Sequence, residues 1–400
     1  MIIFKTNSFP NISETFIVSN IIETIKKGYS VTIITDKINS ISKTSQKNLI
    51  DDFELIKRTQ VNFSPKERPI RYLKAMYLLL HPLKLYFFFK FWQLRKKKSL
   101  SYIFIIQFYW KFRKAKLFHV HFATAINPLF DLKQIGLLKS NIIVTFHGYD
   151  AHFLPKGTNL EMLLNNFKEY VSNITVNSTY LKNKLIAKGF LKETISIVPI
   201  GYDETIFKPT KEKLSQNLPF KLISIGRLVT IKGHQFGVKA VKQLKDNGIQ
   251  VKYTIVGEGV EYKQLVKLIK KLKLEDAVNL VGAKSQLEIK KLLEEHHLFL
   301  MTSTKDEFNR QEAFGVVSLE AQAMGLPIVG FNSGGFPETI IEGKTGITVK
   351  DKDVDSFTNA IEKLILNKEK LIFMSRAAKT HVKKNFNIAL TTKKYLDLYN

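Results

Sequence analysis

The chain has 400 residues, enough for two domains that each bury a core, and its hydrophobic content of 44% is typical of a globular protein. Cysteine is absent, which excludes disulfides and thiolate metal sites, and no uncharged, mainly apolar run reaches the ~20 residues that span a bilayer. The formal net charge of +27 fits an anionic partner, either a nucleic acid or a membrane, or simply a lysine-rich proteome.

The N-terminal residues alternate between strand and helix patterns. Residues 2–5 form a short apolar strand, and residues 31–35 form the next strand. Between them, helical spacing up to Gly28 is kept by Phe16, Ile17, Ile21, Ile22 and Ile25. No G-x-G-x-x-G sequence occupies the first turn, which disfavours a nicotinamide or flavin enzyme. Residues 1–20 also lack the pattern of a secretory signal peptide. These patterns predict an α/β domain.

Residues 65–116 form a basic aromatic segment with 14 Lys/Arg and one Asp/Glu. Its aromatic residues include Tyr72, Tyr77, Tyr86, Phe87, Phe88, Phe89, Phe91, Trp92, Phe108, Tyr109 and Trp110. Aromatic rings beside basic residues suit the interface of an anionic bilayer, where each Lys/Arg adds about 1 kcal/mol. Two alternatives are a pair of ordinary helices with an aromatic face in the core, and a nucleic-acid surface. We expect the anionic membrane to be the partner and expect no nucleic acid.

Two further strands, at residues 117–122 and 141–146, lead to a candidate ligand residue. His147 follows the carboxyl end of the second strand, where α/β sheets present ligand-binding loops, although a lone histidine is more often structural. His119 and His121 alternate along a strand, and we expect structural roles for them. No acidic cluster joins these histidines at metal-ligand spacing, so we predict no metal site.

The alternation of strands and helices resumes after a polar stretch, residues 208–219, which we predict to be a linker. Arg227 and Lys232 follow the strand at 222–225, and two cations at such a point can neutralise a diphosphate, although basic loop residues are usually only solvated. Gly257 follows the next strand, and Gly282 and Ala283 follow the strand after that.

Two carboxylates, Glu312 and Glu320, stand eight positions apart around a predicted helix at 314–324. Eight helical residues span roughly 12 Å, and the free N–H groups of the first helical turn, at residues 314–316, lie between the two carboxylates. A helix start attracts phosphate. A nucleotide sugar, with hydroxyls at both ends and a diphosphate in the middle, would match this arrangement. The alternative is a surface helix with two ordinary glutamates.

The same stretch resembles the donor-binding segment of retaining glycosyltransferases of the GT-B fold, family 4. The matching residues are Glu312, Phe314, Gly315, Glu320, residues 323–328 and the Gly-Gly-Phe-Pro-Glu turn at 334–338. Residues 226–233 resemble the Gly-Arg-Leu-x-x-x-Lys-Gly sequence of this family, and residues 198–203 resemble its interdomain segment. Residues 9–10, 13–17, 119–122 and 145–150 resemble the subgroup that builds exopolysaccharides of the colanic acid and amylovoran type.

The resemblance implies a GT-B architecture of two facing Rossmann-like domains with a cleft between them. We expect an N-terminal acceptor-side domain at 1–205, a nucleotide-sugar-binding domain at 206–380, and a C-terminal helix at 381–400 that packs back on the first domain. The implied reaction moves a sugar from a UDP- or GDP-sugar to a hydroxyl with retention, without a metal or other cofactor.

The resemblance also implies roles for individual residues. Arg227 and Lys232 would hold the diphosphate, and Glu320 would accept hydrogen bonds from the ribose. Glu312 and His147 would hold the donor sugar. The other expected nucleotide contacts are Gly257, Gly282 and Ala283, and the other expected sugar contacts are Ala313, Phe314, Gly315 and Val316.

The subgroup implies a lipid-linked glycan acceptor at the cytoplasmic face of the plasma membrane, to which the protein would bind peripherally. Two rival functions remain open. One is a nucleotide-sugar epimerase or hydrolase of the same fold, and the other is a membrane-associated glycan-binding protein without catalytic activity.

Overall fold

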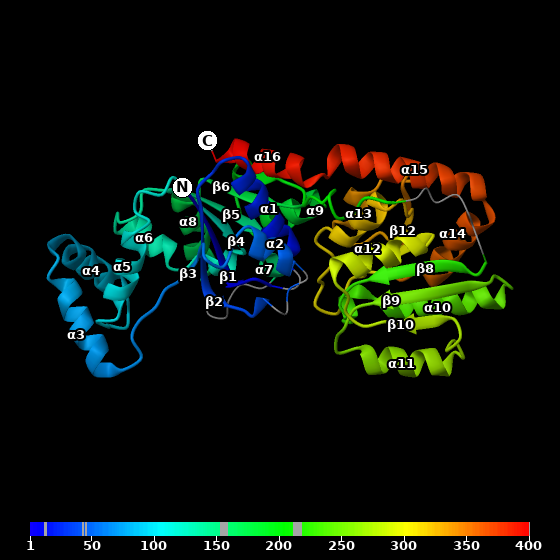
Figure 1. The fold of residues 1–400 in the computed structure, drawn as a ribbon, viewed down its shortest axis with the longest axis horizontal. Helices are drawn as coiled ribbons and strands as arrows, with labels where there is room; N and C mark the ends of the chain where they lie inside the picture. Colours follow the sequence, from blue (N-terminus) through cyan, green and yellow to red (C-terminus); the bar gives the residue numbers. More distant parts are fainter. Residues whose placement is uncertain (12–13, 42–43, 45, 153–158, 211–217, 400) are drawn as a thin grey trace. The chain divides into compact units, whose positions relative to one another are not determined.

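A computed structural model describes residues 1–11, 14–41, 44, 46–152, 159–210 and 218–399 (Figure 1). The chain divides into two compact units. The N-terminal unit comprises Met1–Val176, Lys184–Ser196 and the residues from Leu396 onward, and the C-terminal unit comprises Asn177–Asn183 and Ile197–Tyr395. Ser13 of the N-terminal motif and residues 211–217 of the predicted linker lie outside the described residues.

The N-terminal unit is built on a seven-stranded parallel sheet in the order β3-β2-β1-β4-β5-β6-β7. The strands are β1 (Ile2–Phe9), β2 (Val31–Ile38), β3 (Thr59–Val61), β4 (Leu117–His121), β5 (Asn141–Phe146), β6 (Asn173–Val176) and β7 (Ile195–Ile197). The helices around it are α1 (Thr15–Lys26), α2 (Lys47–Asp52), α6 (Leu129–Gln134), α7 (Tyr149–His152) and α8 (Leu160–Tyr170). The residues of α9 (Thr179–Ala187) are divided between the two units after Asn183. Every residue of β4 is buried, as expected for a central strand of a parallel sheet that is covered on both faces.

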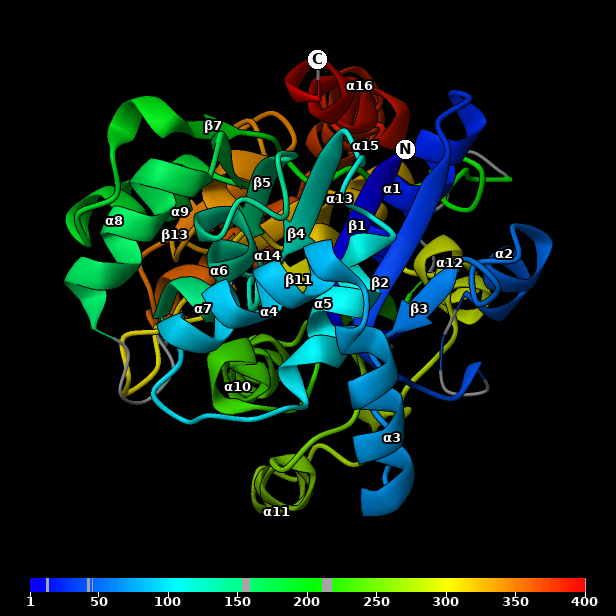
Figure 2. The ribbon, with the colours of Figure 1, turned by 90° about the vertical axis from the view of Figure 1, so that its left-hand side faces the viewer.

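The basic aromatic segment folds into three helices, α3 (Arg68–Leu79), α4 (Pro82–Leu94) and α5 (Tyr102–Trp110). Pro69 and Pro82 lie in the first turns of α3 and α4, where a missing N–H breaks no helical hydrogen bond. Figure 2 shows α3 extending away from the strands of the N-terminal sheet. In the described part of the chain, no helix is long and apolar enough to cross a membrane.

The C-terminal unit is a six-stranded parallel sheet in the order β10-β9-β8-β11-β12-β13. Its strands are β8 (Phe220–Ile225), β9 (Val251–Val256), β10 (Val278–Leu280), β11 (Leu298–Met301), β12 (Ile328–Phe331) and β13 (Gly346–Val349). Its helices include α10 (His234–Asp246), α11 (Tyr262–Lys271), α12 (Gln286–Glu295), α13 (Val316–Ala323), α14 (Val354–Leu366) and α15 (Lys368–Asn385). The strand order reverses between β8 and β11, and doubly wound sheets bind ligands at the carboxyl ends of the strands at such a reversal.

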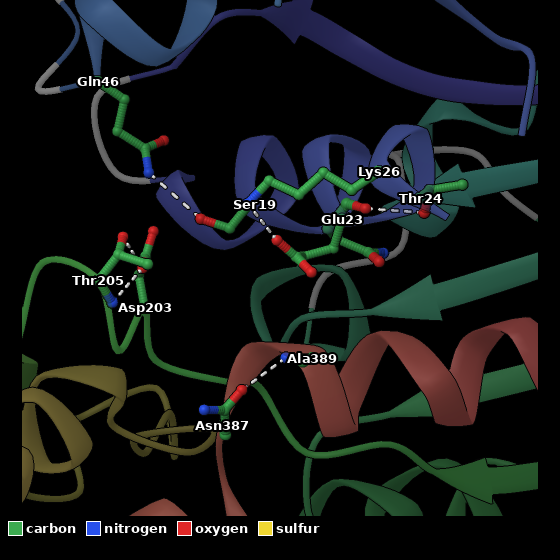
Figure 3. Close-up of polar contacts among 10 residues, drawn as sticks. Ser19, Glu23, Thr24, Lys26, Gln46, Asp203, Thr205, Asn387 and Ala389 are labelled. Atoms are coloured by element: carbon green, nitrogen blue, oxygen red, sulfur yellow. Dashed lines mark hydrogen bonds and ion pairs between the residues drawn. The ribbon is translucent and has the colours of Figure 1, made fainter. Parts of the chain in front are cut away.

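The segment that resembles an interdomain connection pairs with the chain just before the last helix, α16 (Ile388–Leu398). Tyr202 exchanges backbone hydrogen bonds with Phe386 and Ile388 at 2.9 and 3.0 Å. A Cβ on Gly201 would lie 2.5 Å from the Cα of Ile388, so this pairing needs a glycine. Figure 3 shows Asn387 Oδ1 accepting from the N–H of Ala389 at the start of α16.

These two parallel sheets confirm the predicted α/β class with two Rossmann-like domains. The last residues of the chain belong to the N-terminal unit, where Tyr399 is buried and its hydroxyl lies 2.6 Å from Nδ1 of His119. His119 Nε2 lies 2.7 Å from Oγ1 of Thr145 on β5. This network ties the end of the chain to two central strands.

Candidate functional site

Three glycine-containing turns lie side by side at the carboxyl edge of the C-terminal sheet. Gly226 donates its N–H to the carbonyl of Val256 at 2.9 Å, and Gly257 donates its N–H to the carbonyl of Gly282 at 2.9 Å. Gly257 has φ +143°, and a Cβ there would lie 1.9 Å from the carbonyl oxygen of Gly226. Only a glycine at 257 lets these turns approach so closely.

The loop after β8 carries the two predicted cations. Arg227 is exposed, while Lys232 is partly buried at the end of a short 3₁₀ turn. The carbonyl of Lys232 accepts from the hydroxyl of Thr302 at 2.8 Å, which joins this loop to the segment after β11. Gly233 adopts φ +58° and begins α10. The two loops at the reversal of the strand order are therefore bonded to each other.

Lys232 and Glu312 form an ion pair through Nζ and Oε2, with side-chain exposures of 18% and 15%. The hydroxyl of Ser303 lies 3.3 Å from the same carboxylate oxygen. Burial of Glu312 would by itself raise its pKa, but Lys232, Ser303 and the nearby charge of Arg227 together hold the pKa below its ordinary value. Glu312 is therefore ionised at neutral pH.

The start of α13 lies against this ion pair. The helix begins at Val316, two residues later than the sequence predicted. Gly315 has φ +90°, and a Cβ there would lie 2.7 Å from Cε of Met301 and 3.6 Å from Cγ of Glu312. The N–H groups of Phe314, Gly315 and Val316 have no acceptor among the described residues. A helix start with free N–H groups, next to a lysine, suits a phosphate group.

The Gly334-Gly335 turn supports the backbone at Glu312 and Ala313. A Cβ on either glycine would lie about 2 Å from a carbonyl oxygen, at 2.0 Å from that of Glu312 for Gly334 and 2.1 Å from that of Ala313 for Gly335. The hydroxyl of Ser178 donates to the carbonyl of Ala313 at 2.7 Å. Ser178 is far from this loop in sequence, and no local pattern marks it, so sequence reasoning missed it.

Glu320 is buried within α13 and has no hydrogen-bond partner among the described residues. Burial raises its pKa to about 8. In the absence of a ligand, this carboxyl group is therefore mostly protonated at neutral pH. The structure brings Lys232 and Glu312 together beside the start of α13, whereas Glu320 lies farther along α13 and has no hydrogen bond or ion pair with either of them.

His147 follows β5 in the N-terminal unit and lies in a buried cluster of rings. Its Nε2 lies 3.0 Å from Nδ1 of His121, and its ring centroid is 4.8 Å from that of Phe16 and 4.6 Å from that of Phe122. Burial first, and then His121, lower the pKa of His147 well below its ordinary value, so the imidazole is neutral. The carboxylate of Asp150 accepts from the N–H groups of His147 and Gly148 at 3.0 and 3.2 Å and fixes the loop.

Ala283 is exposed next to the turn at Gly282, so the surface beside the three turns is open.

Within the described part of the chain, no three His, Asp or Glu side chains are grouped so that they could hold a metal ion.

Comparison with known proteins identifies the class of the fold and a family model that matches the second half of the chain. The chain aligns with the HepE protein of Anabaena, solved in complex with UDP-glucose, at a TM-score of 0.74 and 18% identity, over 99% of this chain and 98% of that chain. The fold is therefore that of the GT-B glycosyltransferases. Residues 207–381 match the family described as Glycosyl transferases group 1, so the protein contains a glycosyltransferase group 1 domain.

Two relatives confirm the resemblance to the exopolysaccharide subgroup. The chain is 28% identical over 282 residues to WcaL of Escherichia coli strain K12, named as a colanic acid biosynthesis glycosyltransferase, with 68% of each protein covered. It is also 28% identical over 396 residues to the amylovoran biosynthesis glycosyltransferase AmsK of Erwinia amylovora, with 96% of this chain and 95% of AmsK covered.

Proposed function

We propose that this protein is a retaining glycosyltransferase that moves a sugar from a nucleoside diphosphate sugar, UDP- or GDP-linked, to a hydroxyl of a growing cell-surface glycan. The ion pair of Lys232 and Glu312 beside the free N–H groups of α13 is the observation that carries this proposal. The UDP-glucose complex of HepE and the names of WcaL and AmsK support the donor class and the glycan class.

The leaving group of this reaction is an anionic diphosphate, and its departure leaves positive charge on the sugar carbon. Arg227, Lys232 and the N–H groups at Gly315 provide fixed positive charge where the diphosphate would develop its negative charge. Arg227 can bind two phosphate oxygens at once through its planar guanidinium group. In this proposal these groups take the part that a divalent metal plays in other transferases, so transfer proceeds without a metal or other cofactor.

The two glutamates bind opposite ends of the donor. Glu312, which is ionised and held by Lys232, accepts hydrogen bonds from hydroxyls of the donor sugar and orients its reacting carbon. Ala313, Phe314, Gly315 and Val316 form the surrounding surface. Glu320 accepts from the ribose hydroxyls and ionises when the ligand binds, while Gly257, Gly282 and Ala283 leave room for the nucleoside. His147, as a neutral imidazole, hydrogen-bonds the donor sugar.

The acceptor is a lipid-linked glycan, and the protein works at the cytoplasmic face of the plasma membrane. The basic aromatic segment, residues 65–116, supports this part of the proposal because its charge suits an anionic leaflet. The exopolysaccharide functions in the names of WcaL and AmsK support it as well.

A donor and product screen tests the proposal. Purified protein is first heated with UDP, GDP and other nucleoside diphosphates, because a ligand that binds only the folded state raises the melting temperature. It is then incubated with the matching sugar nucleotides and a lipid-linked glycan extract, with and without EDTA. We expect stabilisation by one diphosphate, transfer that survives EDTA, and retained anomeric configuration in the product by NMR.

The rival functions give different results in this screen. Turnover of the donor without any acceptor would indicate a hydrolase or an epimerase. Failure of every nucleotide to stabilise the protein would indicate a glycan-binding protein instead. Inversion at the anomeric carbon, or loss of transfer in EDTA, would overturn the corresponding part of the proposed mechanism.

A further inference from the structure

The three helices of the basic aromatic segment do not share one environment. Helices α4 and α5 bury aromatic and aliphatic side chains in the N-terminal unit, among them Phe88, Phe91 and Tyr109. Helix α3 buries only Ala75. Ordinary core packing, one of the alternatives for this segment, therefore accounts for much of α4 and α5 but leaves the apolar residues of α3 unexplained.

Those residues form a stripe. Leu73, Met76, Tyr77 and Leu80 have the i, i+3, i+4, i+7 spacing that places side chains on one face of a helix. They are exposed by 73%, 59%, 74% and 79%. An amphipathic helix on a globular protein normally turns such a stripe toward the core, whereas here it faces solvent. A continuous exposed apolar surface of this kind marks an interaction site.

Basic side chains accompany the α3 stripe. Lys66, Arg68 and Lys74 are exposed on or next to α3, and the same basic aromatic segment carries a further exposed run, Lys96, Lys97 and Lys98, after α4. The only acid among residues 65–116 is Glu67. A second copy of this chain would bring the same cations together and repel, and a nucleic acid would leave the apolar stripe in water. An anionic bilayer satisfies both features, because it offers negative headgroups above an apolar interior.

We propose that α3 lies in the surface of an anionic membrane, with Leu73, Met76, Tyr77 and Leu80 inserted below the headgroups and the accompanying cations bound to lipid phosphates. A 12-residue helix is only about 18 Å long, which suits a helix lying in the plane of the interface. This inference deepens the proposed function and rests on it in one respect, since insertion would bring the protein to a lipid-linked acceptor.

The absence of cysteine allows a clean test of insertion. The Leu80→Cys variant of the full chain is labelled at its cysteine with the polarity-sensitive fluorophore NBD. The labelled protein is then mixed with vesicles made of phosphatidylcholine alone or of phosphatidylcholine with phosphatidylglycerol. The matched control is Leu366→Cys, since Leu366 is 73% exposed on α14 of the C-terminal unit. We expect the label at 80 to brighten and shift to shorter wavelength only with anionic vesicles, and less so at high salt, whereas the label at 366 stays unchanged.

A pair of double variants tests the stripe itself by vesicle sedimentation. Leu73→Ser with Leu80→Ser should weaken binding to anionic vesicles by about tenfold or more, whereas Leu366→Ser with Phe373→Ser, at exposed apolar sites of the C-terminal unit, should not. Both variants should keep the melting temperature and the UDP or GDP affinity of the wild type, because none of these residues belongs to the core or to the donor site.

Three outcomes would overturn the inference. In the first, the fluorescence of the label at position 80 stays unchanged when vesicles are added. In the second, the two double variants bind vesicles equally. In the third, the label brightens with protein concentration alone and light scattering shows a dimer, which would mean that the stripe binds a second copy of the chain. Nucleotide affinity is measured on the same samples. Loss of vesicle insertion with intact nucleotide binding refutes only this inference, whereas vesicle insertion without nucleotide binding refutes the proposed function and leaves this inference standing.

Discussion

At the residue scale, the two carboxylates of the proposed donor site, eight positions apart, differ in charge. Glu312 is held ionised by Lys232, Ser303 and Arg227, whereas Glu320 is buried without a partner among the described residues and its pKa rises to about 8. A carboxyl group that is protonated in the free protein and ionised in the complex would couple donor binding to pH.

This difference predicts how stability changes with pH. Because the pKa of Glu320 rises from 4.5 to about 8 on folding, its folded form binds more protons than the unfolded form between these values. The stability it contributes is complete below pH 4.5 and is lost as the pH rises to about 8. Glu320→Gln removes this loss, so the stability of the variant relative to wild type should rise with pH across that window, by up to about 5 kcal/mol at its upper end. Urea unfolding at a series of pH values measures it, and a constant difference would contradict the assignment.

Glu312 allows a test that separates sugar binding from nucleotide binding. Glu312→Gln keeps the size of the side chain but removes the charge that we propose holds the donor sugar. We expect kcat/KM for the identified donor to fall about 100-fold, roughly 3 kcal/mol in transition-state stabilisation, while the affinity for the free nucleoside diphosphate is kept. Equal losses in both measurements would show that Glu312 acts only by supporting the fold of the loop.

At the element scale, the turn after β9 and the turn before β13 each contain a glycine, at Gly257 and Gly343, but for different reasons. At Gly257 an added Cβ would strike the carbonyl of Gly226, whereas at Gly343, with φ +72°, an added Cβ meets nothing within 4 Å. Gly343→Ala should therefore lower the free energy of unfolding by about 1 kcal/mol through backbone strain alone. Gly257→Ala should lower it by roughly 3 kcal/mol or more. Chemical denaturation compares the two, and similar losses would argue against close approach of the turns.

The sequence predicted some of these elements better than others. Arg227 and Lys232 could be placed at the ligand-binding edge of the sheet because they follow the carboxyl end of a buried strand. Glu312 could be associated with them only through the resemblance to the glycosyltransferase family. The hydrogen bond from Ser178 to Ala313 and the contact of His121 with His147 could not be predicted, because they depend on tertiary packing. Periodicity also predicts an apolar stripe on α3 but cannot tell whether that stripe meets a core or solvent.

At the scale of the whole molecule, two doubly wound sheets follow one another in a single chain, and each has its own buried core. The alternation of strands and helices in the sequence predicted this class, and the group 1 domain at 207–381 covers most of the second unit. The end of the chain returns to the first unit at Leu396, and buried Tyr399 bonds to His119 there. Truncation before Leu396 would therefore expose a core position, a consequence that no local sequence pattern reveals.

Calorimetric titration with nucleoside diphosphates is the most direct test of the central claim, that Lys232 and its neighbours bind a diphosphate. We expect UDP or GDP to bind the wild type, Lys232→Ala to weaken that binding by about 10- to 100-fold, and Lys242→Ala to leave it unchanged. Lys242 is a matched control because it also forms an ion pair, with Asp246, but on an exposed face of α10. Absence of binding to the wild type, or equal affinity in the Lys232 variant, would contradict the account.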